Sequence, residues 1–152
     1  MNKGLVVIED TDHHRSLLET AGELAAGAGA ELVLLSMKST EDVAADRDAI
    51  AQVNPDRLGT YGTDTAEQQL RHTTHTVARD ALADTEVDYE VAPKIVDSKT
   101  EATAILDSAE EHGCDHIFMV GRKRSPTGKA LFGDLAQSVM LAFDGQVTVE
   151  LE

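Results

Sequence analysis

The chain has 152 residues, of which 28 are acidic and 13 basic, and its formal net charge is −15. A surface this negative repels nucleic acids and anionic lipids except where cations are concentrated, so neither is an expected partner. The length suits one domain over residues 1–152, built around one packed core. The acidity also predicts adaptation to a salt-rich cytoplasm, where 1 M salt screens charges over about 3 Å.

Cysteine content and hydropathy narrow the class of protein further. Cys114 is the single cysteine, which excludes an intramolecular disulfide and a zinc site built on several cysteines. No stretch approaches the roughly 20 apolar residues that span a bilayer, and residues 1–7 carry no secretory pattern. We therefore expect a cytoplasmic protein without a membrane segment.

The chain opens with an apolar run, residues 5–8, which predicts a central strand buried on both faces. Residues 9–12, Glu-Asp-Thr-Asp, then supply a turn and a helix N-cap. A helix is expected next, because apolar residues recur at helical spacing before two glycines end it. Its expected inner face holds Leu17, Leu18, Ala21, Leu24 and Ala25, and the glycines are Gly27 and Gly29. A second apolar strand is predicted over residues 32–37.

The middle of the chain has weaker signals. Between residues 38 and 63 the apolar periodicity lapses, and only a short helix near residues 41–52 is indicated. A long helix is predicted over residues 65–84, with an inner face of Leu70, Val77, Ala81 and either Thr73 or Thr74. Val87, Tyr89 and Val91 alternate with acidic residues, which predicts a third strand with one solvent-exposed face at the outside of the sheet.

The last third repeats the alternation of helix and strand. A helix over residues 100–112 is expected to end at Gly113, and an apolar strand follows over residues 117–120. A further helix should begin near Ala130 or Gly133 and reach about Phe143, before a final strand over residues 147–151. This order is typical of an α/β fold with a parallel sheet, helices on both faces and a ligand crevice at the carboxyl ends of the strands.

The loop between Gly121 and Gly133 concentrates positive charge. Arg122, Lys123, Arg124 and Lys129 are four of the 13 basic residues, and Gly128 adds a third glycine. A loop from strand to helix in a parallel sheet presents backbone N–H groups and a positive helix end to an anion. These features together predict a phosphate or nucleotide site, and a solvated surface loop is the alternative.

Two acidic residues, Glu9 and Asp10, follow the first strand. In a receiver domain of a two-component system such a pair holds Mg²⁺ beside a phosphate-accepting aspartate. The strand near residues 87–91 begins later than the receiver spacing allows, and a hard cation needs more oxygen ligands than this pair supplies. These two points count against a receiver-like phosphoacceptor, and we keep it only as an alternative.

Five segments in order, LVVIEDTD, GAELVLLSM, EATAILDSAEEHGCDHIFMVGR, GKALFGDLAQSVM and QVTVE, resemble the universal stress protein family over nearly the full chain. The resemblance implies a Rossmann-like fold of the adenine nucleotide alpha hydrolase type, with five parallel strands in the order 3-2-1-4-5. It also implies dimers formed through the last strand and, in nucleotide-binding members, a motif Gly-x2-Gly-x9-Gly-Ser/Thr after the fourth strand. Together with the acidity, it points to a halophilic archaeon as the source.

The resemblance assigns site residues to this chain. Asp10 matches the aspartate that touches the nucleoside, and Gly121 and Gly133 match the first and last motif glycines. The other residues implied at an ATP or adenine nucleotide site are Ile8, Met37 and Val120 against base and ribose, Arg122, Arg124 and Lys129 against phosphate, Gly128 in a pliable loop, and Asp134.

Three departures from the motif bear on nucleotide binding. Arg124 stands at the second glycine, the loop to Gly133 is one residue short, and Asp134 replaces the Ser/Thr. A carboxylate about 4 Å from a phosphate costs roughly 1 kcal/mol in water, which favours loss of binding. Alternatively, Asp134 is a helix N-cap, which is favourable by about 1 kcal/mol without any ligand.

The remaining candidate chemistry is sparse. His13 and His14 cannot share a helical face, whereas His72 and His75 can, but two ligands without a third do not make a metal site. We interpret these four histidines as solvated helix surface. The sequence has no nucleophile with a matched base and no complete P-loop, so catalytic machinery is not expected.

Two principal hypotheses follow. The first is a regulatory or binding module that forms homodimers and holds an adenine nucleotide with little or no hydrolysis. The second is a stress protein that binds no nucleotide and acts by pairing with itself or other proteins. Its operative surface would be the last strand, with Val147, Val149 and Leu151, because an apolar edge strand accepts another strand.

Overall fold

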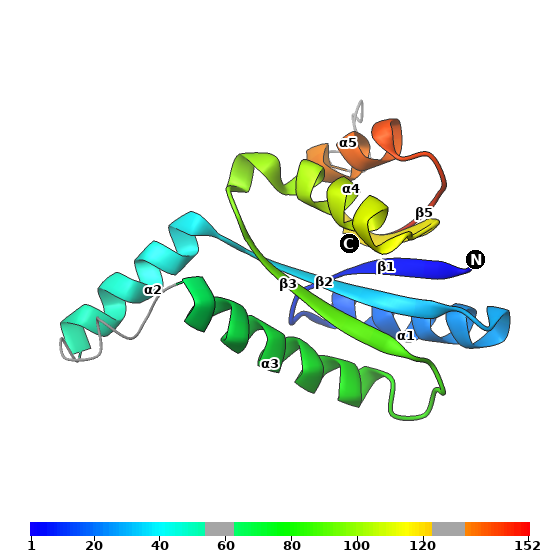
Figure 1. Cartoon of the computed structure of the whole chain (residues 1–152), viewed down its shortest axis with the longest axis horizontal. Coiled ribbons are helices and arrows are strands. Elements are labelled where there is room, and N and C mark those ends of the chain that lie inside the picture. The colour runs from blue at the N-terminus through cyan, green and yellow to red at the C-terminus, as the bar shows by residue number, and fades with distance from the viewer. Residues whose placement is uncertain (54–62, 123–132) are drawn as a thin grey trace.

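The computed structural model describes residues 1–53, 63–122 and 133–152 (Figure 1). Strands and helices alternate along the chain as the sequence predicts. Their bounds are β1 Lys3–Ile8, α1 Asp12–Ala28, β2 Glu31–Ser39, α2 Thr40–Val53, α3 Thr63–Ala81, β3 Tyr89–Val96, the 3₁₀ helix η2 Ser98–Thr100, α4 Glu101–His112, β4 His116–Gly121, α5 Asp134–Ala142 and β5 Gln146–Leu151.

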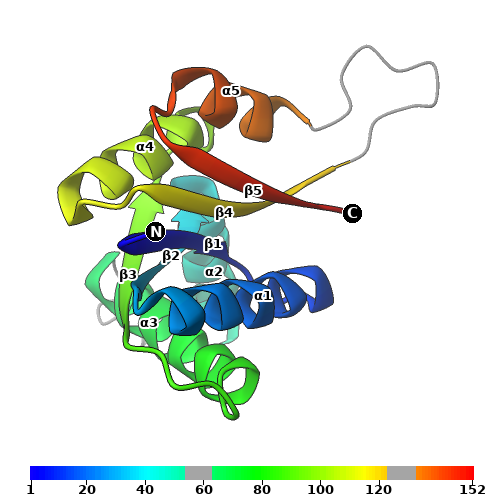
Figure 2. The ribbon, with the colours of Figure 1, turned by 90° about the vertical axis from the view of Figure 1, so that its right-hand side faces the viewer.

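The described strands form one sheet in the order β3-β2-β1-β4-β5, and every neighbouring pair is parallel. The predicted Rossmann-like α/β fold with order 3-2-1-4-5 is confirmed, and β3 lies at an edge as its alternating pattern indicated. A receiver domain has the order 2-1-3-4-5, so the receiver interpretation is wrong. Helices α1 and α3 cover one face of the sheet, and α4 and α5 cover the other (Figure 2).

The core lies in two layers, because successive side chains of a strand point to opposite faces. Along β1, Val6 and Ile8 pack with α1 and α3, whereas Leu5 and Val7 pack with α4 and α5. Phe118 of β4, which is fully buried, belongs to the layer of α1 and α3. An all-apolar strand is thus explained by burial on both of its faces.

Helix α1 differs from its prediction in two details. Leu24 is 48% exposed and lies outside the inner face of the helix, whereas the next residue, Ala25, is fully buried on that face. Gly27 lies within the helix, and only Gly29 ends it, in a left-handed conformation with φ 66°. The backbone N–H of Gly29 donates to the carbonyls of Ala25 and Ala26. A glycine is needed at this position because a side chain disfavours positive φ.

Helices α2 and α3 show why the middle of the chain had weak signals. Helix α2 extends away from the sheet and buries no residue, so no face of it requires apolar periodicity (Figure 1). In α3, Thr74 is 3% exposed and its hydroxyl donates to the Leu70 carbonyl at 2.8 Å, while Thr73 is exposed. The internal hydrogen bond is what permits a threonine on a buried helical face.

Candidate functional site

A cavity of about 410 Å³ opens at the carboxyl edge of the sheet. Its apolar wall includes Ile8, Met37 and Val120, which lie at or near the carboxyl ends of β1, β2 and β4. These strands are neighbours in the sheet, so their ends meet at one place. The size is within the range of small-molecule pockets, roughly 300–1,000 Å³.

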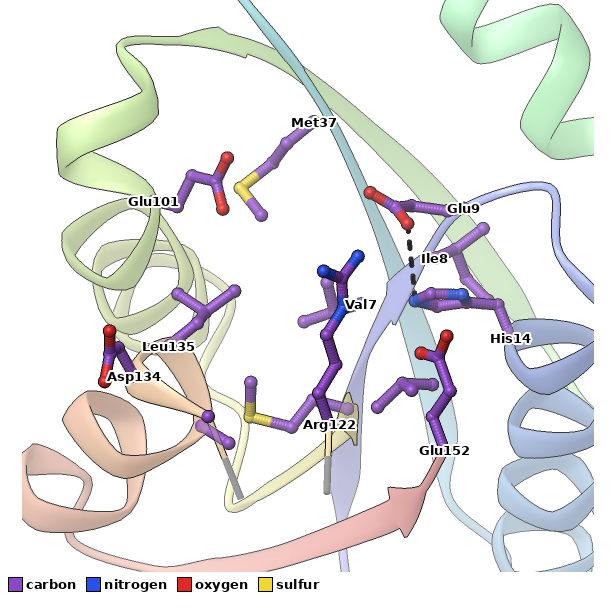
Figure 3. Close-up of a pocket in the computed structure, with 14 residues that line it drawn as sticks. Val7, Ile8, Glu9, His14, Met37, Glu101, Arg122, Asp134, Leu135 and Glu152 are labelled. Atoms are coloured by element: carbon purple, nitrogen blue, oxygen red, sulfur yellow. Dashed lines mark ion pairs between the residues drawn. The ribbon is translucent and has the colours of Figure 1, made fainter. Parts of the chain in front are cut away.

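The two ends of the loop predicted to bind phosphate, Arg122 and Gly133, lie next to each other. A side-chain Cβ built on Gly133 would lie 3.8 Å from the backbone nitrogen of Arg122, so the ends of the loop are adjacent. The Arg122 side chain extends into the middle of the cavity (Figure 3). Within residues 1–53, 63–122 and 133–152, no carboxylate forms an ion pair with it. The structure therefore presents a guanidinium to the cavity that can receive an anion.

Helix α5 begins at the cavity, and its first turn differs from the N-cap expectation. Gly133 occupies the N-cap with φ 78° and ψ 160°, and Asp134 is the first helical residue. The interpretation of Asp134 as the N-cap is therefore wrong by one residue. The cause is the backbone conformation at the cap, which glycine adopts far more readily than other residues. Asp134 nevertheless lines the cavity, and it is an acidic residue in the first turn of α5, where a negative charge is favourable.

Helix α4 also begins at the cavity and places Glu101 there. The preceding turn is fixed by Asp97, whose side chain accepts a hydrogen bond from the Lys99 backbone N–H at 2.9 Å. Glu101 follows directly and lines the cavity beside Met37 (Figure 3). Partial burial, and then the negative charge of Glu9, raise the pKa of the Glu101 carboxyl. The sequence pattern did not single out this residue.

His14 is 9% exposed, so its interpretation as solvated helix surface is wrong. Its backbone N–H donates to Thr11 Oγ1, the N-cap of α1, at 3.2 Å, and its ring Nδ1 lies 2.6 Å from the same oxygen. Its Nε2 lies 3.9 Å from Glu9 Oε2 at the cavity. Burial lowers the pKa of the imidazole, against the charge of Glu9, which raises it. His14 precedes the buried Leu17 and Leu18 by three and four positions, and this helical spacing could have predicted that His14 lies on the buried face of α1.

Glu9 and Asp10 are adjacent in the sequence but have different surroundings. Asp10 does not line the cavity, and it forms an ion pair with Arg15 at 3.1 Å. Arg15 also pairs with Asp80 at 2.7 Å, which joins α1 to α3. Glu9 lines the cavity instead. The chain turns after β1, and this turn decides which of two adjacent carboxylates meets the cavity.

Gly121 and β5 complete the rim. Gly121 is buried at the end of β4, and its carbonyl accepts a hydrogen bond from the backbone N–H of Glu152 at 3.0 Å. This bond brings Glu152 to the cavity, although the sequence analysis did not single it out. Arg124, Gly128 and Lys129, predicted at the same site, lie outside the described residues.

The described residues contain no group of three or more His, Cys, Asp or Glu side chains that could hold a metal ion. In the same part of the chain, no helix is long and apolar enough to cross a membrane. Of the other histidines interpreted as helix surface, His13 and His72 are exposed, and His13 pairs with Glu150 at 3.3 Å. His75 is half-buried, and the centre of its ring lies 6.0 Å from that of Tyr89.

Comparisons with known proteins agree with this architecture. A family model described as the universal stress protein family matches residues 1–149. A universal stress protein from Archaeoglobus fulgidus has 21% identity and a TM-score of 0.62, and the match covers 98% of this chain and 97% of that one. No curated protein sequence gives a significant match.

Two further solved structures hold nucleotides. A universal stress protein in complex with cAMP has 17% identity and a TM-score of 0.60, with 99% of this chain and 96% of that chain covered. The Archaeoglobus fulgidus universal stress protein in complex with dAMP has 15% identity and a TM-score of 0.57, with coverage of 98% and 96%. At such identities the likeness shows the fold alone.

Proposed function

This chain belongs to the universal stress protein family, and we propose that it is a binding module that holds an adenine nucleotide in the cavity at the carboxyl edge of the sheet. The proposal rests on the position of the Arg122 side chain. Its guanidinium extends into the cavity, and no carboxylate of the described residues forms an ion pair with it. A guanidinium binds phosphate with two parallel hydrogen bonds, which suits this position.

The lining divides into parts that suit the parts of a nucleotide. Ile8, Met37 and Val120 form an apolar surface for the base. Gly133 leaves space for phosphate beside Arg122 at the first turn of α5, where backbone N–H groups are unpaired by the helix. Glu9 stands at the cavity where Asp10 was expected, so we assign the ribose hydroxyls to Glu9, since a carboxylate accepts hydrogen bonds from ribose.

The complexes of related folds with cAMP and dAMP support an adenine nucleotide as the ligand class. Hydrolysis would need an activated water or a nucleophile, and the described lining of the cavity contains no serine, threonine or cysteine that could act as one. We therefore propose binding with little or no hydrolysis.

Calorimetric titration with AMP tests the proposal. Saturable binding is expected for the wild type. Arg122→Gln should weaken binding about tenfold to a hundredfold, because a hydrogen bond to a charged group contributes about 1.5–3 kcal/mol. Arg47→Gln removes the same charge on the exposed helix α2 and should leave the affinity unchanged. Absence of saturable heat for AMP would reject nucleotide binding and leave the alternative of a module that acts through protein contacts.

Self-association has its own structural support. β5 is an edge strand, so one side of its backbone has no neighbouring strand within the described sheet. Val147 and Val149 are half-buried against the layer of α4 and α5, and Leu151 is 40% exposed. We propose a homodimer through β5, formed chiefly by backbone pairing. Light scattering at micromolar concentration should give twice the mass of one chain, and a monomer would refute this pairing.

A further inference from the structure

One side of the cavity is formed by His14 and Glu9, which come from different elements. His14 lies in the first turn of α1, and Glu9 follows β1 directly. Both residues line the cavity, and Nε2 of the imidazole faces the Glu9 carboxylate (Figure 3). His14 is 9% exposed, so its ring is held by the surrounding protein. A buried polar ring at a cavity can act on a ligand through whichever of its nitrogens is turned toward that cavity.

The hydrogen bonds around the ring assign a proton to Nε2. The hydroxyl oxygen of Thr11 lies 2.6 Å from Nδ1, so one of these two atoms donates to the other. If Nδ1 of the neutral ring were the donor, Nε2 would direct a lone pair at the Glu9 carboxylate, and two acceptors repel each other. When the Thr11 hydroxyl donates instead, Nε2 keeps its N–H. Nε2 also carries a proton in the charged ring, so it is a donor in both charge states.

The separation of Nε2 from the Glu9 carboxylate suits a shared ligand group. Nε2 lies 3.9 Å from Oε2, whereas a direct hydrogen bond spans about 2.7–3.2 Å. Within the described parts of the chain, no hydrogen bond occupies Nε2. Because 3.9 Å is less than two hydrogen-bond lengths, one ligand atom can reach both groups. That atom must accept a hydrogen bond from Nε2 and donate one to the carboxylate.

A hydroxyl group meets both requirements, because its oxygen accepts a hydrogen bond while its proton is donated. The other polar groups of an adenine nucleotide meet only one of them. A phosphate oxygen and a ring nitrogen of adenine accept, and the exocyclic amino group of adenine donates. Among the parts of the proposed ligand, the ribose hydroxyls are therefore the groups that match His14 and Glu9 together.

We propose that His14 is a specificity-determining residue of the nucleotide site and that, with Glu9, it binds a ribose hydroxyl. This inference rests on the proposed adenine nucleotide site and adds the sugar that the site selects. The Nε2–H group of His14 donates to the hydroxyl oxygen, and the Glu9 carboxylate accepts the hydroxyl proton. The site then prefers a ribonucleotide to a nucleotide without ribose hydroxyls.

The preference depends more on His14 than on Glu9. The Glu9 side chain is 65% exposed, so water can replace a missing hydroxyl there. The His14 ring is buried, and a ligand without the hydroxyl leaves its N–H without a partner. A buried donor that loses its partner changes an affinity by about fivefold or more. Sites that hydrogen-bond a substrate hydroxyl reject analogues that lack it for the same reason.

Calorimetric titration of the full chain with AMP and with dideoxy-AMP, which lacks both ribose hydroxyls, tests the inference. The wild type should bind AMP about fivefold or more tightly. His14→Phe keeps a ring and removes both nitrogens. It should reduce this ratio by about threefold or more and bind dideoxy-AMP at least as tightly as the wild type. His14→Gln retains an N–H donor and should keep more of the ratio. His13→Phe makes the same change at the adjacent exposed residue and should leave the ratio unchanged.

Nitrogen NMR of the histidine rings tests the same inference in the wild type, should neither His14 variant fold. In the neutral ring of His14, Nε2 should carry the proton. Its signal should shift more with AMP than with dideoxy-AMP, because only AMP supplies a hydroxyl. A neutral ring protonated at Nδ1 would overturn the inference, since Nε2 would then be an acceptor.

The outcomes of the titration separate the inference from the proposed function. Equal affinity of the wild type for AMP and dideoxy-AMP would overturn the inference and leave nucleotide binding in place. A His14→Phe variant that binds both ligands more weakly by the same factor would also overturn it, because a purely structural role gives that result. A wild type that binds neither ligand would reject the proposed function, and the inference with it.

Discussion

Replacing Gly133 with alanine should destabilise the protein through the backbone at the start of α5. Gly133 has φ 78° and ψ 160°, a region that residues with a side chain rarely adopt. The space around it is not the obstacle, because an added Cβ would meet Arg122 atoms no closer than 3.8 Å. The cost is therefore conformational strain, on the order of 1–3 kcal/mol.

This cost converts to a measurable change in melting temperature. For a domain of 152 residues, 1 kcal/mol shifts the Tm by about 2–4 °C. Gly133→Ala should lower the Tm by roughly 2–12 °C in thermal unfolding followed by circular dichroism. Because Arg122 lies beside Gly133, a rearranged start of α5 should also weaken AMP binding.

Gly27→Ala is the matched control, because it makes the same chemical change inside α1. Nothing lies within 4 Å of a Cβ at Gly27, and its backbone is helical. Alanine should therefore stabilise the protein by about 1 kcal/mol, from its higher helix propensity. The two variants are expected to change stability in opposite directions. A Gly133→Ala protein as stable as the wild type would refute the strained conformation at the cap.

Three further predictions concern stability. Burial lowers the pKa of His14 in the folded protein, so the unfolded chain binds a proton at a higher pH than the folded protein does. The free energy of unfolding should therefore fall as the pH drops below 6.5. In urea titrations, His14→Leu should reduce this pH dependence. Thr11→Ala removes the N-cap of α1 and should cost about 1 kcal/mol in the same titrations, and no loss would contradict the cap. With a net charge of −15, the Tm should rise between low and molar KCl, and a flat salt dependence would reject the halophilic interpretation.

The fold was largely predictable because its strongest constraints are local. Apolar runs marked the central strands, and Gly29 and Gly113 marked helix ends, where both have positive φ. Strand ends also placed Ile8, Met37 and Val120 at one edge, since parallel strands present their carboxyl ends together. The order 3-2-1-4-5 came from the family resemblance, because alternation of helix and strand does not fix the order of strands.

The polar part of the site was less predictable because it depends on tertiary direction. Whether Glu9 or Asp10 faces the cavity depends on the turn after β1 and on Arg15, which pairs with Asp10. Glu101 and Glu152 reach the cavity because helix α4 begins there and strand β5 ends there, and neither residue belongs to a motif. The burial of His14 could have been predicted from its spacing to the apolar residues on the inner face of α1. The adjacent pair His13 and His14 instead suggested that both side chains are exposed on the helix surface.

The most direct test of the central claim is NMR mapping of AMP binding. Saturable shift changes are expected at Ile8, Met37, Val120 and Arg122, and at the start of α5. Another cavity, at the amino edge of the sheet, is lined by residues that include Ala25, Gly29 and Val87, and these should show no shift changes. Shift changes confined to that second cavity, or none anywhere at saturating AMP, would contradict the claim that the carboxyl edge of the sheet is the nucleotide site.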